Sequence, residues 1–128
     1  MHGKVVHFEI PVDDGDRARS FYASAFGWTM TEMPEMRYTM VETGPSDPQT
    51  GPTEPGFING GMLERSGDNT APNLVIDVDD IEAALRDVTA AGGSTVSGRQ
   101  PVGEMGFSAY VRDSEGNLVG LWETATGG

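Results

Sequence analysis

One stretch of this chain is written twice, and this internal duplication constrains the fold more than any single motif. Residues 6–27 and 72–93 align 66 positions apart. The identical pairs are Ile10 and Ile76, Val12 and Val78, Asp13 and Asp79, Asp14 and Asp80, Ala18 and Ala84, Ala25 and Ala91, and Gly27 and Gly93. Two repeats are too few for a solenoid. They predict two pseudo-symmetric halves that share one cleft.

Length and composition exclude several classes of protein. The 128 residues have the length of one domain, which we expect over residues 1–128 with modules at about 4–66 and 72–124. A net charge of −12 disfavours contact with nucleic acid or an anionic membrane surface. The absence of cysteine excludes disulfides, thiol nucleophiles and cysteine-ligated metals. No signal-peptide pattern or membrane-spanning apolar run is present, so we expect a cytoplasmic protein.

Both halves predict the same order of elements, a strand, a helix and three further strands. For the first half we expect strands at 5–12, 28–33, 37–43 and 57–64 with a helix ending at Gly27. For the second half we expect strands at 73–78, 94–96, 107–112 and 118–123 with a helix ending at Gly92 and Gly93. Asp14 or Asp16, and Asp79 or Asp80, are the predicted helix caps. Four prolines predict a long irregular loop over residues 44–56, and residues 113–117 predict a hairpin connection.

A doubled βαβββ unit of this size resembles the vicinal oxygen chelate superfamily, which includes glyoxalases, extradiol dioxygenases and bleomycin resistance proteins. The resemblance rests on three segments: residues 6–14 continuing to Phe26-Gly27-Trp28, residues 78–82, and residues 113–117. It implies an α+β fold in which the two modules form a curved half-barrel cleft with the helices outside. Many members bind a divalent metal in that cleft, with ligands from the first and last strands of each half.

The resemblance places the four ligand positions at His7, Gly61, Asn73 and Gly120. Only His7 is a good ligand, and one imidazole with one neutral amide supplies too few donors and too little charge for a divalent ion. We therefore predict a degenerate metal site and no resident cofactor. The alternative is a divalent metal such as Zn, Ni, Mn or Fe bound through other residues.

Strand alternation predicts which side chains face the cleft. If His7 faces it, so do Glu9 and Pro11, and in the second half Asn73, Val75 and Asp77. If Arg112 opposes Leu118 across the last hairpin, then Tyr110 opposes Gly120 and Ser108 opposes Trp122 on the same face. The ring of Tyr110 is then expected over Gly120. Weaker candidates in the first half are Thr39, Val41, Asn59 and Leu63.

Each of these residues has a structural and a functional interpretation. His7 is either a metal ligand or a structural and ligand-contacting residue. Glu9, a carboxylate in an apolar strand, either pairs with Arg37, Arg112 or His7, or serves in proton transfer. Trp122 and Tyr110 are either core aromatics or pocket walls.

We therefore predict a binding or sequestering protein of the glyoxalase and bleomycin-resistance type. The predicted ligand contacts are Asn73, Ser108, Tyr110, Arg112, Leu118 and Trp122, with His7 and Glu9 as orienting polar groups. The alternatives are a metal-dependent lyase, isomerase or dioxygenase, and a metal-free enzyme that uses His7 and Glu9 as catalytic acid and base. The predicted partners are a small molecule and a second copy of the chain, because outer strands of an open sheet invite pairing.

Overall fold

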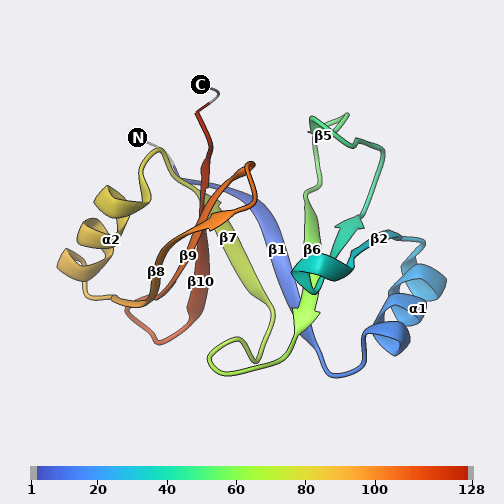
Figure 1. Cartoon of the computed structure of the whole chain (residues 1–128), viewed down its shortest axis with the longest axis horizontal. Helices are drawn as coiled ribbons and strands as arrows, with labels where there is room; N and C mark the ends of the chain where they lie inside the picture. The colour runs from blue at the N-terminus through green and yellow to red at the C-terminus, as the bar shows by residue number, and fades with distance from the viewer. Residues whose placement is uncertain (1–2, 127–128) are drawn as a thin grey trace. The chain divides into compact units, whose positions relative to one another are not determined.

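The computed structural model describes residues 3–126 and divides into two compact units. One unit is His7–Pro72, here called the N-terminal unit. The other, the C-terminal unit, is Asn73–Gly128 together with Met1–Val6. Each unit carries one of the two helices, and the α+β class predicted from the sequence is confirmed (Figure 1).

The N-terminal unit follows the predicted order of strand, helix and three strands, with small additions. Its elements are β1 (Lys4–Val12, which starts in the other unit), α1 (Gly15–Phe26), β2 (Thr29–Met33), the 3-10 helix η1 (Pro34–Met36), β3 (Tyr38–Glu42), β4 (Ser46–Asp47), β5 (Gly51–Pro52) and β6 (Asn59–Glu64). The strands lie in the order β2-β3-β6-β1, with β1 and β6 parallel and the other pairs antiparallel. The proline-rich segment, expected to be irregular throughout, contains the short hairpin β4–β5.

Local sequence signals explain where α1 begins and ends. The Asp14 carboxylate accepts a hydrogen bond from the backbone N–H of Arg17 at 3.0 Å and so caps the helix. Gly27 ends it in the left-handed conformation with φ of 73°, which glycine adopts without steric cost. Of the two predicted caps, Asp14 is therefore the one used.

The C-terminal unit repeats the arrangement. It consists of β7 (Asn73–Asp77), α2 (Ile81–Ala90), β8 (Ser94–Val102), β9 (Gly106–Arg112) and β10 (Leu118–Thr124), with strand order β7-β10-β9-β8. Strand β8 is longer than predicted, and its pairing with β9 contains two register irregularities, between Thr95 and Ser97 and between Ser97 and Gln100. Asp80 caps α2 by accepting from the backbone N–H groups of Glu82 and Ala83.

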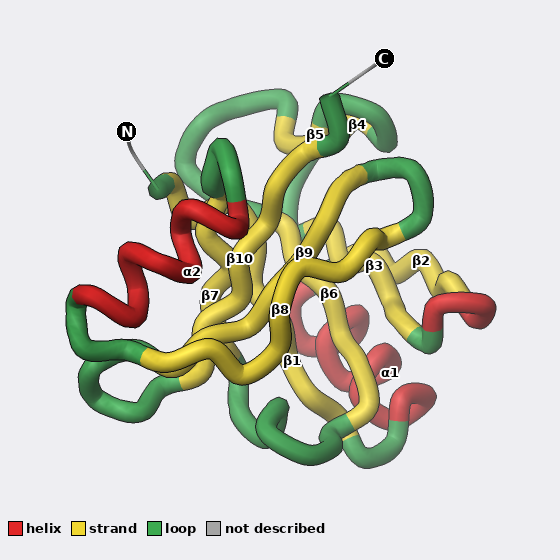
Figure 2. Tube along the Cα trace, turned by 60° about the vertical axis from the view of Figure 1, so that its left-hand side comes forward, coloured by secondary structure: helices red, strands yellow, loops and turns green. Residues whose placement is uncertain are grey.

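Apolar side chains of α2 and its sheet form the core of the C-terminal unit. Ile81 is fully buried among Ala109, Val111 and Leu121, and Figure 2 shows α2 beside the strands of its own unit.

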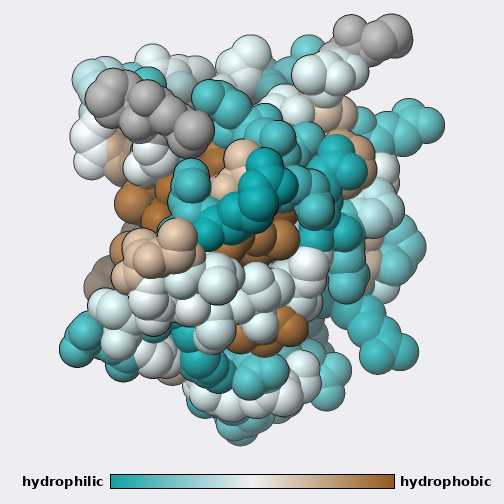
Figure 3. Space-filling model, turned by 90° about the vertical axis from the view of Figure 1, so that its left-hand side faces the viewer, coloured by the Kyte–Doolittle hydropathy of each residue, from teal (hydrophilic) through white to brown (hydrophobic). Residues whose placement is uncertain are grey.

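Seen from the side of α2, the surface is largely hydrophilic with small hydrophobic areas between polar side chains (Figure 3). Within residues 3–126, neither helix has the length and apolar character needed to cross a membrane.

Candidate functional site

Strand pairing places the first-strand polar residues on one face of the N-terminal sheet. His7, Glu9 and Pro11 pair with Asn59, Gly61 and Leu63 of the parallel neighbour β6. On the other side of β6, the antiparallel strand β3 pairs Tyr38 with Leu63 and Met40 with Gly61. Because side chains alternate along a strand, all of these residues belong to one face. We call it the His7 face.

A hydrogen-bonded chain of three side chains lies on the His7 face. The Nε2 atom of His7 is 2.7 Å from the Tyr38 hydroxyl oxygen, and the Tyr38 hydroxyl donates to Oε2 of Glu9 at 3.1 Å. The carboxylate of Glu9 is buried, at 7% exposure. Of the partners predicted for Glu9, His7 is therefore linked to it, through a tyrosine that sequence reasoning did not single out.

Tyr38 reaches this position because residue 61 has no side chain. A Cβ atom built on Gly61 would overlap the hydroxyl and ring carbons of Tyr38. The phenol thus fills the space into which a side chain at position 61 would project. Position 61 is one of the four that the family resemblance assigns to metal ligands.

Burial and charge act on His7 in opposite directions. Burial lowers the pKa of His7 below its ordinary value of 6.5, and the charge of nearby Glu9 opposes that shift. Burial is the larger effect, so the imidazole is neutral at pH 7. A neutral imidazole has one nitrogen that donates and one that accepts.

Thr39 and Val41, two of the weaker cleft candidates, lie on the opposite face, so their predicted placement is wrong. The hydroxyl oxygen of Thr39 accepts a hydrogen bond from Nη1 of Arg19 on α1 at 3.2 Å. Arg37, the residue before β3, has a left-handed backbone with φ of 52°, and the register of β3 places Tyr38 and Met40 on the His7 face. Asn59 and Leu63 lie on the His7 face as predicted.

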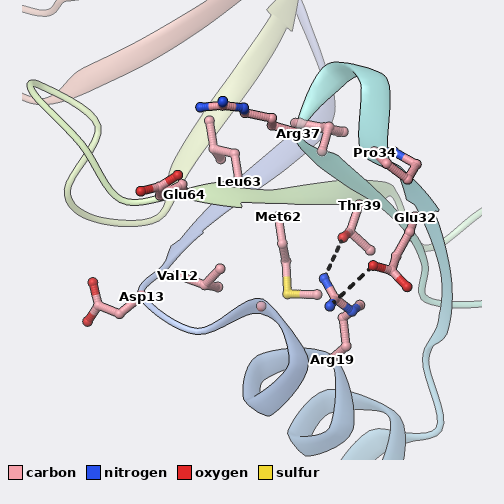
Figure 4. Close-up of a pocket in the computed structure, with 12 residues that line it drawn as sticks. Val12, Asp13, Arg19, Glu32, Pro34, Arg37, Thr39, Met62, Leu63 and Glu64 are labelled. Carbon is pink, nitrogen blue, oxygen red and sulfur yellow. Dashed lines mark hydrogen bonds and ion pairs between the residues drawn. The ribbon is translucent and has the colours of Figure 1, made fainter.

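A cavity of about 240 Å³ lies mainly between α1 and the sheet, and Tyr38 and Leu63 are also among the residues that line it (Figure 4). Arg19 extends into it from the helix toward Thr39 and Glu32. The guanidinium is ion-paired with Asp16 and, at 3.3 Å, with Glu32. Since the cavity is smaller than the roughly 300 Å³ at which ligand pockets begin and its central cation is already paired, we do not place the functional site there.

The C-terminal unit confirms the predicted register of the last hairpin. Asp113 closes the turn by accepting from the backbone N–H groups of Glu115 and Asn117, each at 2.9 Å. In the β9–β10 ladder the opposed pairs are Arg112 and Leu118, Tyr110 and Gly120, and Ser108 and Trp122. A Cβ atom on Gly120 would lie 3.5 Å from ring carbon Cε1 of Tyr110, so the predicted cover of this glycine is present.

Several predicted ligand contacts of this unit also have structural partners. The Arg112 guanidinium donates to the carbonyl oxygen of Gly116 at 2.9 Å, within the hairpin. The indole Nε1–H of Trp122 donates to the hydroxyl of Thr124 at 3.1 Å. Asn73 is buried, at 6% exposure. These contacts fix the orientation of the side chains, and the role of each residue toward a ligand stays a prediction.

The residues present do not fit the metal of the family pattern. In the N-terminal unit the two ligand positions are His7, whose Nε2 is engaged by Tyr38, and Gly61, whose side-chain space Tyr38 fills. In the C-terminal unit they are Asn73 and Gly120, which supply no charge. No group of three or more His, Asp or Glu side chains able to hold an ion occurs among residues 3–126.

Comparison with known proteins shows similarity to bleomycin-resistance and glyoxalase proteins. A model of the bleomycin resistance protein-like N-terminal family matches residues 4–44. A Vibrio parahaemolyticus protein named probable lactoylglutathione lyase is 29% identical over 124 residues, which cover 94% of this chain and 90% of that protein.

Solved structures with a similar fold cover nearly the whole chain. A methylmalonyl-CoA epimerase variant of Streptomyces coelicolor, in complex with 2-nitronate-propionyl-CoA, superposes with a TM-score of 0.63 at 17% identity, covering 96% of this chain and 98% of that one. A glyoxalase/bleomycin resistance protein/dioxygenase superfamily member from Vibrio splendidus gives a TM-score of 0.62 at 15% identity, covering 96% and 99%. The chain therefore has the fold of these proteins, and the matched family model and the sequence relatives support the resemblance to the vicinal oxygen chelate superfamily, the group of glyoxalases, bleomycin resistance proteins and dioxygenases.

Proposed function

We propose that the His7 face binds a small organic molecule directly, with no divalent metal between the protein and its ligand. The ligand contacts proposed for the C-terminal unit are Asn73, Ser108, Tyr110, Arg112, Leu118 and Trp122. The names of the relatives support a small-molecule ligand, since one is named probable lactoylglutathione lyase and another methylmalonyl-CoA epimerase. The sequence-based prediction of a binding or sequestering protein is therefore retained.

The observation that carries this proposal is the position of the Tyr38 hydroxyl. It meets both the imidazole of His7 and the carboxylate of Glu9, and it fills the space beside Gly61. A metal ion at this point would have to displace the phenol and break both hydrogen bonds. Two protein ligands would then remain in this unit, fewer than the three that a catalytic zinc site normally has.

A metal-free acid–base enzyme is the second candidate. The same three residues favour it, because a neutral histidine backed by a carboxylate through a hydroxyl can take up a proton and be stabilised in its charged form. The lowered pKa of His7 keeps the imidazole in the basic form at neutral pH. Lactoylglutathione lyase and methylmalonyl-CoA epimerase assays on the chelator-treated protein test this candidate, with His7→Ala as the control.

The binding proposal is tested by ligand-induced stabilisation. A library of small acids, thioesters and aromatic compounds is screened for an increase in Tm, first with a chelator and then with added zinc. Stabilising compounds are expected to act equally in both conditions and to lose their effect in His7→Ala. Stabilisation that appears only with zinc would contradict the proposal.

Thr39→Ala is the matched control variant. Thr39 lies on the α1 side of the same strand that carries Tyr38, and its hydroxyl contacts Arg19. The substitution therefore changes a buried polar side chain of β3 without touching the His7 face. We expect ligand-induced stabilisation to survive in Thr39→Ala, and its loss there would place binding on the wrong face of the sheet.

A further inference from the structure

The hydrogen-bonded chain on the His7 face has a direction. A carboxylate has no proton to give, so Glu9 accepts the single proton of the Tyr38 hydroxyl. The Tyr38 oxygen can then only accept from His7, across the 2.7 Å contact with Nε2. This requires the proton of the neutral imidazole to lie on Nε2. The other ring nitrogen, Nδ1, is left as an acceptor.

We propose that Glu9, acting through Tyr38, fixes the tautomer of His7 and thereby selects ligands that present a hydrogen-bond donor to Nδ1. Glu9 is thus a positioning residue that sets the specificity of a group it does not touch. The inference rests on the proposed function in one respect, that the ligand enters the His7 face. The inference adds the chemical class of that ligand, a molecule that presents an O–H or N–H donor to Nδ1.

The second nitrogen of His7 is available for such a contact. Within residues 3–126, Nδ1 makes no hydrogen bond, and the ring is only half-buried. The imidazole ring also stacks against the rings of Phe8 and Tyr38, with centroids 6.4 and 6.3 Å apart. An accepting nitrogen in a partly desolvated position favours an O–H or N–H group over another acceptor by about tenfold.

The surroundings of His7 define the rest of the ligand. Met40 lies opposite Gly61 and is 37% exposed, and Leu63 lies opposite Tyr38. Asn59, the other polar side chain opposite His7, is engaged elsewhere, since it accepts from the backbone N–H of Thr43 and donates to Ser46. The part of the ligand beside His7 is therefore expected to be a mostly apolar group with one donor, such as a phenol.

The test compares tautomers at one pH in chelator-treated protein. Nitrogen-15 NMR of the histidine rings distinguishes a protonated from an unprotonated ring nitrogen. In wild type we expect the His7 proton on Nε2. In Glu9→Gln the amide can donate to Tyr38, whose hydroxyl can then turn and donate to Nε2. We therefore expect the population protonated at Nδ1 to rise several-fold.

Tyr38→Phe separates this effect from a general disturbance of the face. It removes the hydroxyl that connects residues 7 and 9, so adding Glu9→Gln to Tyr38→Phe should leave the tautomer populations of His7 unchanged. A Glu9→Gln variant with the wild-type tautomer ratio would overturn the proposal. So would an equal response to Glu9→Gln in the presence and absence of the Tyr38 hydroxyl.

Phenol and anisole, which differ in the presence of the donor, test the ligand class. We expect phenol to bind wild type about tenfold more tightly than anisole, measured from the His7 resonances, and this preference to shrink or reverse in Glu9→Gln. Equal affinities would overturn the assigned ligand class. If neither probe perturbs His7 at millimolar concentration, it is the proposed function that fails at this face, while the tautomer comparison still decides the role of Glu9.

Discussion

Substituting Gly61 with alanine tests the close approach on which the site depends. The new methyl group would overlap the end of the Tyr38 side chain, so the tyrosine must swing away. That movement breaks the hydrogen bonds to His7 and Glu9. The loss is about 1.5–3 kcal/mol for the bond to a carboxylate and about 0.5–1.5 kcal/mol for the neutral one.

Alanine offsets part of this cost. Replacing glycine within a strand gains roughly 0.5–1 kcal/mol by restricting the unfolded chain. The expected net loss in the free energy of unfolding is therefore about 1–4 kcal/mol, measured by urea denaturation. Gly98→Ala is the matched control, because Gly98 also lies in a strand and a Cβ atom there would meet nothing within 4 Å. We expect that variant to be no less stable than wild type.

A double-mutant cycle isolates the contact. In a Tyr38→Ala background there is no ring to displace, so Gly61→Ala should stabilise the protein by roughly 0.5–1 kcal/mol, and the coupling between the two sites should equal the lost hydrogen bonds, about 3 kcal/mol. The crystal structure or NMR contacts of Gly61→Ala should show the tyrosine released from His7. Additive effects of the two substitutions, or a Gly61→Ala variant as stable as wild type, would refute the reasoning.

Four further predictions concern titration, the pH dependence of stability, helix capping and assembly. Replacing Glu9 with Gln removes the charge that raises the pKa of His7, so the NMR-measured pKa of His7 should fall, and an unchanged value would show that the two groups do not interact. Burial lowers the folded-state pKa of His7 below 6.5, so the unfolded chain takes up a proton there more readily than the folded protein. The free energy of unfolding should therefore fall as the pH drops below 6.5, by at most about 1.4 kcal/mol per pH unit. Urea titrations of His7→Gln should lack this dependence of stability on pH. Asp80→Ala should cost about 1 kcal/mol in urea denaturation, and Asp80→Asn, which keeps a capping oxygen, should cost clearly less. Light scattering at micromolar concentration should give the mass of two chains, since Phe21 and Phe26 of α1 are 56% and 64% exposed, and a one-chain mass would contradict a homodimer.

The last hairpin of the chain could be predicted in detail because short-range signals fix it. Asp113 and the residues after it define a turn, and the turn sets the register of every pair that follows. The position of Tyr110 over Gly120 follows from that register alone. The helix cap at Asp14 was likewise one of two candidates readable from the sequence.

The key residue of the first half escaped prediction for a physical reason. The repeat aligns Tyr38 and Thr39 with Phe107 and Ser108, which places Thr39 on the cleft face. In the structure Tyr38 pairs with Leu63, two residues after Gly61, and Ser108 pairs with Trp122, two residues after Gly120. Tyr38 is therefore the structural counterpart of Ser108. The turn before β3 shifts the register by one position, and a one-residue shift exchanges the two faces of a strand.

A signal for Tyr38 does exist in the sequence. The argument that places an aromatic ring over Gly120 applies equally to Gly61, and Tyr38 is the aromatic residue of the strand beside it. Applied to both halves, it predicts a ring over each of the two glycines. The hydrogen bonds from that ring to His7 and Glu9 required the structure, because they depend on where the hydroxyl lies within the face.

Calorimetric titration of chelator-treated wild type with zinc, nickel and manganese tests the central claim most directly, with the Gly61→Glu, Tyr38→Ala double variant as the comparison. That variant removes the phenol and adds a second carboxylate beside His7 and Glu9, a ligand set suited to a divalent ion. The account predicts only heats of dilution for wild type and measurable binding for the folded double variant. Tight binding of one metal ion per wild-type chain would contradict it.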